Sequence, residues 1–463
     1  MSDQRTSAVE IVRTLRERGF QAYLVGGCVR DLLLGREPAD YDVATDATPN
    51  EVMSLFPKTY AVGAQFGVVL VETGNLSRRA VDRQPATCPG EPRAGNCIEV
   101  ATFRNDGIYS DGRHPDEVRY TKTPQEDVQR RDFTINGLLL DPLADDKVLD
   151  FVGGQADLKA GIIRTIGDPE RRFAEDKLRM LRAVRFAARF GYRIEEKTMH
   201  AIKKMAASIH EVSRERVRDE LTKMLTEGRA RRAFELLDED ESGLLVEVLP
   251  EIAKMKGVEQ PPQFHPEGDV WVHTLMLLES LAPDCSPTLA WGALLHDVGK
   301  PPTFRIAPDR IRFDSHAEVG AKMAEEICRR FRFSNEETER VTGLVSHHMR
   351  FPEVTRMRDS TLKRFLRMPN FPEHLELHRI DCGASHRDLG LYNFVSEKLQ
   401  SLGEEEIRPA PLISGDDLIA SGYQPGPLFK EMLSACEDAQ LEGQLHSKEQ
   451  ALEWVKEHFP VKI

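Results

Sequence analysis

Residues 26–46, GGCVRDLLLGREPADYDVATD, combine two glycines, a short helical segment and two aspartates, Asp40 and Asp42. Short β-rich runs at 22–27 and 41–46 flank the helical segment and favour a mixed α and β domain. On a strand, residues two apart share a face, so Asp40 and Asp42 are predicted to lie side by side while Tyr41 points away. Paired carboxylates repel unless a cation lies between them, and their hard oxygen ligands suit magnesium.

The nucleotide-binding chemistry of this stretch follows from its glycines and arginine. Gly27 lets backbone N–H groups approach a triphosphate, and Arg30 is placed to clamp it. A third carboxylate is usual in two-metal transfer, and the nearest candidate is Glu99 in the strand-like run IEVATFR. Glu99 is equally compatible with a solvent-facing strand position.

Composition sets the limits on the class of protein. The chain has 463 residues, more than one hydrophobic core usually serves, so two to four domains are expected. The net charge of -13 argues against nucleic acid only if the charge is evenly spread, but residues 171–190 carry seven basic and two acidic side chains. A basic stripe therefore lies within an acidic protein.

The location expected from the sequence is the cytoplasm. No apolar run reaches the roughly 18 residues that a membrane helix needs, and the first 20 residues lack the apolar core of a signal peptide. The seven cysteines are scattered, odd in number and without a CxxC pair, which favours reduced thiols over disulfides or structural zinc. We therefore expect no membrane partner.

Four ordered motifs connect the chain to a known family: YLVGGCVRDLLLG, DYDVAT, RRDFTIN and EDKLRMLRAVRF. Over about residues 20–225 the sequence resembles the class II tRNA nucleotidyltransferases, also called CCA-adding enzymes, and the related bacterial poly(A) polymerases. The resemblance implies a polymerase-β-like head and a helical neck and body that hold the acceptor end of tRNA. It also implies that Asp40 and Asp42 bind metal and that Gly27 and Arg30 contact the nucleotide.

The helical pattern EDKLRMLRAVRF suggests how the base is chosen. Asp176 accepts hydrogen bonds and Arg179 donates them from a neighbouring face, which would admit cytosine and adenine and refuse uracil and guanine. An exposed ion pair is the alternative interpretation. Arg182 is expected to assist the nucleotide. Arg185, nearly opposite Asp176, is expected to hold RNA or the fold, although the family places both matching arginines at the nucleotide.

The motif RRDFTIN supplies further candidate contacts. Arg131 is expected to bind phosphate and Asp132 the ribose hydroxyls, with Asn136 supporting the loop. The Gly-containing stretch 104–118 before it is predicted to be a loop that moves between C addition and A addition. Residues 77–96, rich in Pro, Gly and Arg, are predicted to form an inserted loop, either solvated or touching RNA.

A histidine-rich region forms a second candidate site. Nine of the 14 histidines lie between His265 and His386. The order of His273, the doublet His296–Asp297 and Asp381 resembles the HD-domain metal phosphohydrolases, whose imidazoles and carboxylates can hold a transition metal and activate water.

Further histidines extend this candidate site. His316, with His347 or His348, is a candidate for a second metal position, although single histidines are often structural. In related tRNA nucleotidyltransferases an HD domain implies phosphatase or 2′,3′-cyclic phosphodiesterase activity.

The predicted fold is α+β, with a polymerase-β-like nucleotidyltransferase head at 1–150 and an all-helical neck and body at 151–255. A helical HD domain at 256–400 and a helical tail at 401–463 follow. The predicted function is magnesium-dependent addition of CCA to tRNA from CTP and ATP. A CC-adding or A-adding specialist and a poly(A) polymerase are alternatives, and a phosphohydrolase with an RNA-binding head is an alternative of another class.

Overall fold

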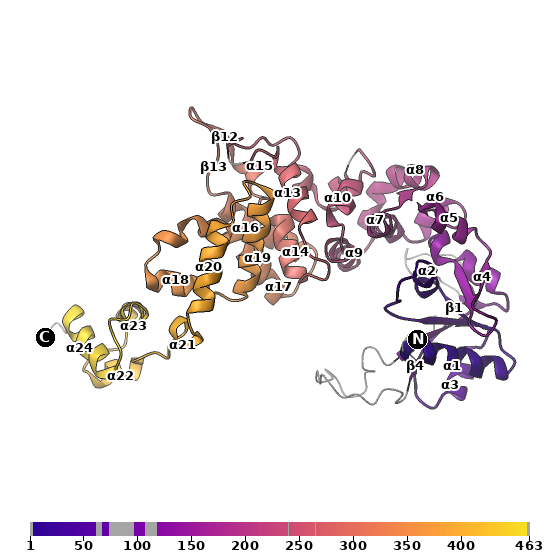
Figure 1. Cartoon of the computed structure of the whole chain (residues 1–463), viewed down its shortest axis with the longest axis horizontal. Coiled ribbons are helices and arrows are strands. Elements are labelled where there is room, and N and C mark those ends of the chain that lie inside the picture. The colour runs from indigo at the N-terminus through magenta and orange to yellow at the C-terminus, as the bar shows by residue number, and fades with distance from the viewer. Residues whose placement is uncertain are drawn as a thin grey trace. The chain divides into compact units, whose positions relative to one another are not determined.

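The computed structural model describes residues 3–61, 67–73, 97–106, 118–238, 240–263 and 265–460 (Figure 1). The 77–96 insertion and most of the 104–118 loop lie outside these residues. The chain divides into two compact units: unit 1 is Met1–Met224 with Arg232–Pro250, and unit 2 is Leu225–Arg231 with Glu251–Ile463. Among the described residues, no helix is long and apolar enough to cross a membrane.

Unit 1 begins with a seven-stranded sheet in the order β3-β4-β5-β2-β1-β8-β9. Its strands are β1 (Ala22–Val25), β2 (Asp42–Thr45), β3 (Thr59–Tyr60), β4 (Val68–Glu72), β5 (Cys97–Thr102), β8 (Leu138–Asp141) and β9 (Lys147–Asp150). β2 and β5 are parallel and the other neighbouring strands are antiparallel. The parallel register sets Asp42 opposite Glu99, so both carboxylates belong to the same region of the sheet.

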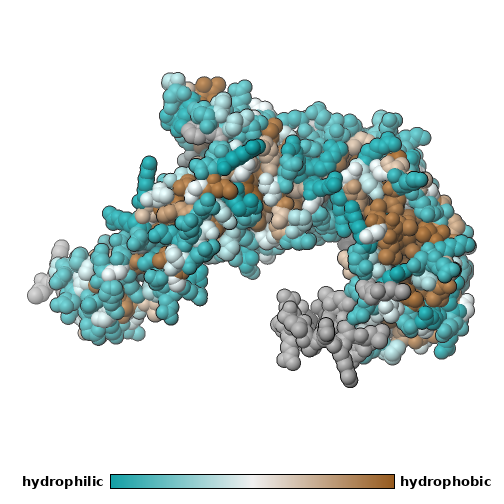
Figure 2. All heavy atoms as spheres, in the orientation of Figure 1, coloured by the Kyte–Doolittle hydropathy of each residue, from teal (hydrophilic) through white to brown (hydrophobic). Residues whose placement is uncertain are grey.

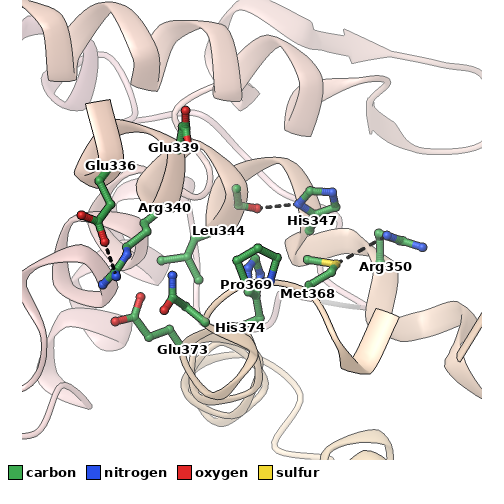
Figure 3. Close-up of a pocket in the computed structure, with 12 residues that line it drawn as sticks. Glu336, Glu339, Arg340, Leu344, His347, Arg350, Met368, Pro369, Glu373 and His374 are labelled. Carbon is green, nitrogen blue, oxygen red and sulfur yellow. Dashed lines mark hydrogen bonds and ion pairs between the residues drawn. The ribbon is translucent and has the colours of Figure 1, made fainter. Parts of the chain in front are cut away.

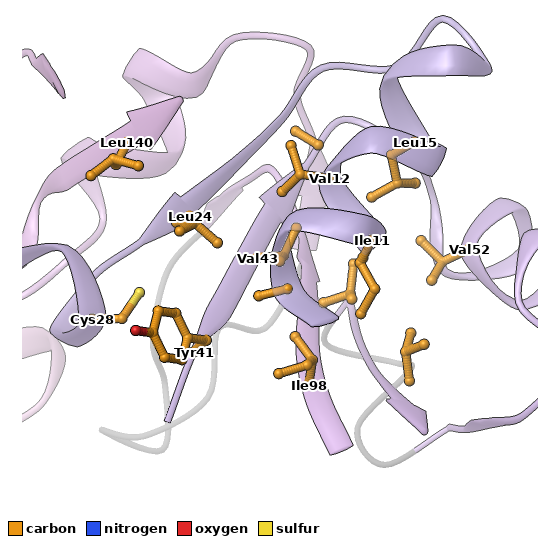
Figure 4. Close-up of a cluster of buried hydrophobic side chains, with 14 of the residues drawn as sticks. Ile11, Val12, Leu15, Leu24, Cys28, Tyr41, Val43, Val52, Ile98 and Leu140 are labelled. Carbon is orange, nitrogen blue, oxygen red and sulfur yellow. The ribbon is translucent and has the colours of Figure 1, made fainter. Parts of the chain in front are cut away.

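Helix α1 (Asp3–Glu17) covers this sheet because its apolar residues recur with the helical period. Ile11, Val12 and Leu15 pack with Leu24 and Val43 of the central strands, as Figure 4 shows. Burial of each such side chain contributes about 2 kcal/mol. The core fixes the central strand β2, and with it the position of Asp42.

Two further helices of the head agree with the sequence. α2 (Gly27–Leu33) follows β1 directly. α3 (Pro49–Leu55) begins after Thr48, whose backbone N–H donates to the Glu51 carboxylate at 2.7 Å in a capping box. The helical segment predicted between the two β-rich runs is therefore confirmed.

Helices dominate the chain after this sheet, which confirms the predicted fold class. In unit 1 they are α4 (Pro124–Gln129), α5 (Gly154–Ala160), α6 (Pro169–Glu175), α7 (Leu178–Phe190), α8 (Glu196–Met205), α9 (Arg214–Thr226), α10 (Ala230–Leu237) and α11 (Leu244–Val248). Figure 2 shows hydrophobic side chains gathered on the face of unit 1 that carries α2 and α7.

One expectation about these helices is wrong. EDKLRMLRAVRF is not one helix, because α6 ends at Glu175 and α7 begins at Leu178. Asp176 between them is extended, with φ -147°, and its side chain accepts a hydrogen bond from the Leu178 N–H at 3.1 Å. This local bond competes with helical pairing and explains the break.

Unit 2 is helical apart from one short hairpin. Its main elements are α13 (Val270–Glu279), α14 (Pro287–Leu295), α15 (Lys300–Thr303), β12 (Phe304–Ile306), β13 (Ile311–Phe313), α16 (His316–Arg330), α17 (Asn335–His347), the 3-10 segment η4 (His348–Arg356), α18 (Asp359–Leu366), α19 (Phe371–Ala384) and α20 (Gly390–Ser401). α22 (Gly415–Ala420), α23 (Pro427–Leu441) and α24 (Lys448–His458) enclose a separate small core at the C-terminal end.

Candidate active sites

A polar cavity of about 450 Å³ in unit 1 brings together most of the candidate nucleotide-binding residues. Its walls come from the glycine turn before α2, the start of β2, the RRDFTIN loop and the α6–α7 region. The lining residues are Gly26, Gly27, Arg30, Asp42, Arg130, Arg131, Asp132, Asn136, Asp176, Arg179, Arg182 and Phe186.

Glycine is required at position 26 by the backbone conformation and by the close approach of a neighbouring side chain. Gly26 has φ +76°, and a Cβ added there would lie 3.3 Å from Nη1 of Arg131. Three residues into α2, the buried Arg30 donates from Nη1 to Oδ1 of Asn136 at 2.6 Å and from Nε and Nη2 to the carboxylate of Asp31. Its guanidinium is thus held in one orientation at the cavity wall.

Asp132 and Arg182 form the central ion pair of the cavity. Oδ2 of Asp132 accepts from Nε and Nη2 of Arg182 at 3.0 and 2.7 Å, while Oδ1 accepts from the Asn136 amide and the Phe133 N–H. Burial alone would raise the pKa of Asp132, but the charge of Arg182 and these hydrogen bonds outweigh it and hold the pKa at about 2. Asp132 is therefore a fixed carboxylate at neutral pH.

The neighbouring side chains of Arg130 and Arg131 are both held by one buried carboxylate. Asp127 on α4 accepts from Nε of Arg130 at 2.8 Å and from Nη2 of Arg131 at 3.0 Å. Two guanidiniums thus face the cavity with their positions set by a single carboxylate.

Asp176 and Arg179 both line the cavity, but no side-chain bond joins them among the described contacts. Oδ2 of Asp176 accepts from Nη2 of Arg216 on α9 at 2.8 Å. Arg179 donates from Nη1 to Oε2 of Glu175 at 2.9 Å and from Nη2 to the Arg130 carbonyl at 3.3 Å. An acceptor and a donor are therefore presented side by side, each held by its own partner.

The three candidate metal ligands, Asp40, Asp42 and Glu99, differ in their position relative to the strands and in their exposure. Asp40 precedes β2 and is exposed, so the expectation that Asp40 and Asp42 share one strand is wrong: the strand begins at Asp42. Burial, and then the charges of Glu99 and Asp40, raise the pKa of Asp42 to about 7. The charges of Glu99 and Asp40 thus reach Asp42, and carboxylate oxygens suit a hard cation, but these three side chains are not among the groups of metal ligands that converge within the described residues.

Of the candidate residues, Asp40, Glu99 and Arg185 do not line the cavity. Arg185 differs in this respect from the other candidate nucleotide-binding residues. It is buried, and its Nε donates to Oε2 of Glu220 on α9 at 2.7 Å. Arg130 and Phe186 line the cavity without having been predicted. Arg130 could have been found from its place beside Arg131, whereas nothing in the sequence marks Phe186.

In unit 2 the first set of ligand atoms comes from three helices. Nε2 of His273 on α13 lies 3.3 Å from Nε2 of His296 and 3.1 Å from Oδ1 of Asp381 on α19. Nδ1 of His273 contacts Glu267 at 2.7 Å, and Nδ1 of His296 contacts the Ala293 carbonyl at 2.8 Å. Donation through Nδ1 leaves two Nε2 lone pairs facing each other, an arrangement that a shared cation relieves.

A second set lies on the other side of Asp297. Nε2 of His316 and Nε2 of His348 are 3.2 Å apart, and Oδ1 of Asp297 is 3.7 and 3.8 Å from them. Oδ2 of Asp297 lies 3.1 Å from Nε2 of His296 in the first set. One carboxylate thus faces both sets, and each set could hold a metal ion. Of the two candidates at 347 and 348, the structure brings His348 to the centre.

A cavity of about 470 Å³ opens over these ligands. Lys300, which was not predicted, lines it and pairs with Oδ2 of Asp297 at 2.7 Å while donating to Oε1 of Gln260 at 2.6 Å. Arg310 and Arg312 of the β12–β13 hairpin line the same cavity. The site therefore combines metal-type ligands with cations suited to phosphate.

Three family models match the chain. The poly A polymerase head domain matches residues 22–164, a probable RNA and SrmB-binding site of polymerase A matches 191–256, and the HD domain matches 270–381. The head-domain match covers the glycine turn, β2 and the RRDFTIN loop, and the HD match covers the ligands from His273 to Asp381, whereas the cavity residues 176–186 lie between the first two matches.

Curated relatives agree with these matches. A CCA-adding enzyme of Leuconostoc mesenteroides is 31% identical over 449 residues, which are 96% of this chain and 94% of the relative. CCA-adding enzymes of a Geobacillus species and of Lactobacillus helveticus are 42% and 38% identical, over 52% and 60% of this chain. These two alignments span only 54% and 65% of the relatives' own length.

Solved structures extend the similarity over the whole chain. The crystal structure of the Bacillus stearothermophilus CCA-adding enzyme in complex with CTP matches with a TM-score of 0.74 and 26% identity, covering 99% of this chain and 98% of that one. A Thermotoga maritima CCA-adding enzyme complexed with tRNA shares the fold, with a TM-score of 0.57 at 19% identity.

Proposed function

The chain belongs to the CCA-adding enzyme family, and from this premise we propose that it adds C, C and A to the 3′ end of tRNA, using CTP and ATP and releasing pyrophosphate. The observation that supports this most strongly is the unit 1 cavity, where Asp42, the Asp132–Arg182 pair, Asp176 and Arg179 line one space. The RNA 3′ hydroxyl attacks the α-phosphate in line, and pyrophosphate leaves.

Asp40 and Asp42 would hold magnesium, with Glu99 as the neighbouring carboxylate. Bound magnesium would lower the pKa of the attacking hydroxyl and offset the charge that develops on the phosphate. Arg131 and Arg30 are positioned to bind the triphosphate, since both guanidiniums line the cavity in fixed orientations.

The proposed nucleotide selection acts at two levels, on the sugar and on the base. Asp132, ionised and fixed by Arg182, would accept hydrogen bonds from ribose hydroxyls in exchange for one of its present donors and so favour NTP over dNTP. Asp176 as acceptor and Arg179 as donor match the amino group and ring nitrogen of cytosine and adenine. Uracil or guanine would leave these groups unpaired, at about 1–3 kcal/mol each.

The test incubates the protein and magnesium with tRNA that lacks CCA, ends in C or ends in CC, and sequences the products made with CTP, ATP or both. Stepwise CCA is expected. A stop after CC, addition only to CC ends or a long A tail would replace the proposal with a specialist or a poly(A) polymerase. Asp40→Ala is expected to abolish addition, and Glu37→Ala, an exposed acid three residues earlier, to preserve it.

The ligand sets in unit 2 favour a second activity, and we propose that it is phosphoester hydrolysis at RNA ends. A transition metal held by His273, His296, Asp297 and Asp381 would polarise the phosphoryl group and activate water. Lys300, fixed between Asp297 and Gln260, contributes positive charge for the phosphate.

Hydrolysis is tested with 2′,3′-cyclic AMP and p-nitrophenyl phosphate, after EDTA treatment and after readdition of Mn²⁺, Ni²⁺ or Mg²⁺. We expect metal-dependent phosphate release that Asp297→Asn abolishes while CCA addition continues. Release that is indifferent to both EDTA and Asp297→Asn would contradict the assignment.

A further inference from the structure

A second cavity in unit 2, of about 630 Å³, is separate from the one over the HD centre and shares no lining residue with it. It lies between α17, the start of η4 and the turn before α19 (Figure 3). His347 lines this cavity, whereas its neighbour His348 belongs to the HD centre. The groups that line it have no part in either activity proposed above.

Arg350 brings an uncompensated positive charge to this cavity. Its Nη1 donates a hydrogen bond to Sδ of Met368 at 3.7 Å, and its guanidinium carbon lies 4.9 Å from the centre of the Phe365 ring. No carboxylate within the described part of the chain pairs with it. A thioether is a weak acceptor, so the guanidinium retains its capacity for a stronger one.

His374 brings an unmet hydrogen bond. Its side chain lines the cavity, the residue is 6% exposed, and Nδ1 has no hydrogen-bond partner among the residues that the structure describes. A buried polar atom left unpaired costs about 1–3 kcal/mol, which a suitable ligand would recover. Burial, and then the charges of His347 and Arg350, lower the pKa of His374 to about 4, so the field of Arg350 reaches this ring.

The acidic side chains around the cavity already have partners or face water. Glu336 pairs with Arg340 at 2.6 Å, and Glu373 accepts from the Ser286 hydroxyl at 2.6 Å. Glu339 is exposed. With a proton on Nδ1, His374 would donate to the same ligand as Arg350, and these two side chains together suit a hydrogen-bond acceptor carrying negative charge.

We propose that this cavity binds a small organic anion, whose phosphate or carboxylate lies against Arg350 and His374. The planar fork of arginine matches both oxyanions. Leu344, Met368 and Pro369 supply an apolar wall for the body of the ligand. The volume is in the range of small-molecule sites and exceeds that of a bare oxyanion, so a body is expected.

The test uses the full chain in EDTA, with 5′-AMP as the organic phosphate and 4-hydroxybenzoate as the organic carboxylate. Hydrogen exchange followed by mass spectrometry is read in peptides from 335–347 and 367–377, which separates this site from the nucleotide cavity in unit 1. We expect at least one of the two anions to slow exchange there, and the one that does identifies the oxyanion.

Variants tie the effect to the proposed contacts. Arg350→Gln is expected to weaken binding about tenfold or more, the effect of losing a charged hydrogen bond. Arg350→Lys, which keeps the charge, should retain part of the binding. Arg356→Gln removes the same charge from an exposed position on the same segment and should change nothing. No protection by either anion, or equal protection in Arg350→Gln with unchanged exchange in α13 and α14, would overturn the proposal.

Discussion

Replacing Asp42 with asparagine should stabilise the metal-free head while abolishing nucleotide addition. The carboxyl of Asp42 has no hydrogen bond or ion pair among the described residues, so asparagine of the same shape loses no contact. What it removes is a charge that burial, Glu99 and Asp40 all disfavour. The substitution therefore separates the effect of the Asp42 charge on the stability of the metal-free head from the role of Asp42 in nucleotide addition.

The magnitude follows from the pKa of Asp42, raised from 3.8 to about 7. At about 1.4 kcal/mol per pH unit, this rise corresponds to about 4 kcal/mol. Water reaches the partly exposed side chain and screens part of the repulsion, so we expect about 2 kcal/mol.

The direction of the pKa shift of Asp42 determines how the stability of the head depends on pH. Because the folded-state pKa lies above the unfolded value, this contribution to wild-type stability is full below pH 3.8. It declines as pH rises and is lost once pH passes about 7. Asp42→Asn lacks this decline, so its advantage is small near pH 4, partial at pH 5 and complete at pH 8.

The assay is hydrogen exchange in EDTA, read in peptides that cover β1 and β5, because all three tryptophans lie in unit 2 and fluorescence would not report on the head. Two kcal/mol corresponds to about 30-fold slower exchange at pH 8. Glu17→Gln, an exposed neutralisation on α1, is the matched control and should leave exchange unchanged.

Equal or faster exchange in Asp42→Asn at pH 8 would refute the reasoning that these carboxylates repel one another. A gain that is the same at pH 5 and pH 8 would show that asparagine stabilises the strand for a reason other than charge. Saturating magnesium should reverse the order, because only the wild type has the ionised ligand.

Three other outcomes are expected. Asp132→Asn should raise KM for CTP about tenfold and reduce discrimination against dCTP, measured as the ratio of kcat/KM values. In the wild type, the pKa of Asp132 is held at about 2, so its ion pair should stabilise the protein above pH 4. This stabilisation should be lost as pH falls toward 2. Glu220→Gln should destabilise unit 1 by about 3 kcal/mol in urea denaturation, because the buried Arg185 loses the carboxylate that accepts from its Nε. Unchanged stability with reduced CTP affinity would assign Arg185 to the nucleotide. Elemental analysis should find two metal ions per chain, about one in His348→Gln and still two in His347→Gln.

The residues that could be predicted best from the sequence lie in short motifs, where several functional side chains follow one another at a fixed spacing. Asp42, Asp132 and Arg182 lie in short motifs with fixed spacing, and the structure places all three in one cavity. The alternating pattern of YDVATD predicted the strand, but not that Asp40 would lie two residues before its pairing begins. Strand ends depend on the partner strand, which a single segment does not reveal.

Other features depend on partners far along the chain. Glu220 meets Arg185 across 35 residues, so the burial of Arg185 had no local signal. The choice between His347 and His348 is similar, because adjacent residues at the end of a helix project in different directions. Only the packing of α17 against the other helices decides that His348 faces Asp297.

The break between α6 and α7 changes how base selection must be understood. On one continuous helix, Asp176 and Arg179 would keep a fixed offset and act as a single surface. In the structure Asp176 belongs to the extended linkage and is held by Arg216, whereas Arg179 is held on α7 by Glu175 of α6. A small rotation of α6 against α7 would therefore move the donor relative to the acceptor. The same two side chains could then fit the differently placed edges of cytosine and adenine, which one rigid helical face would not do.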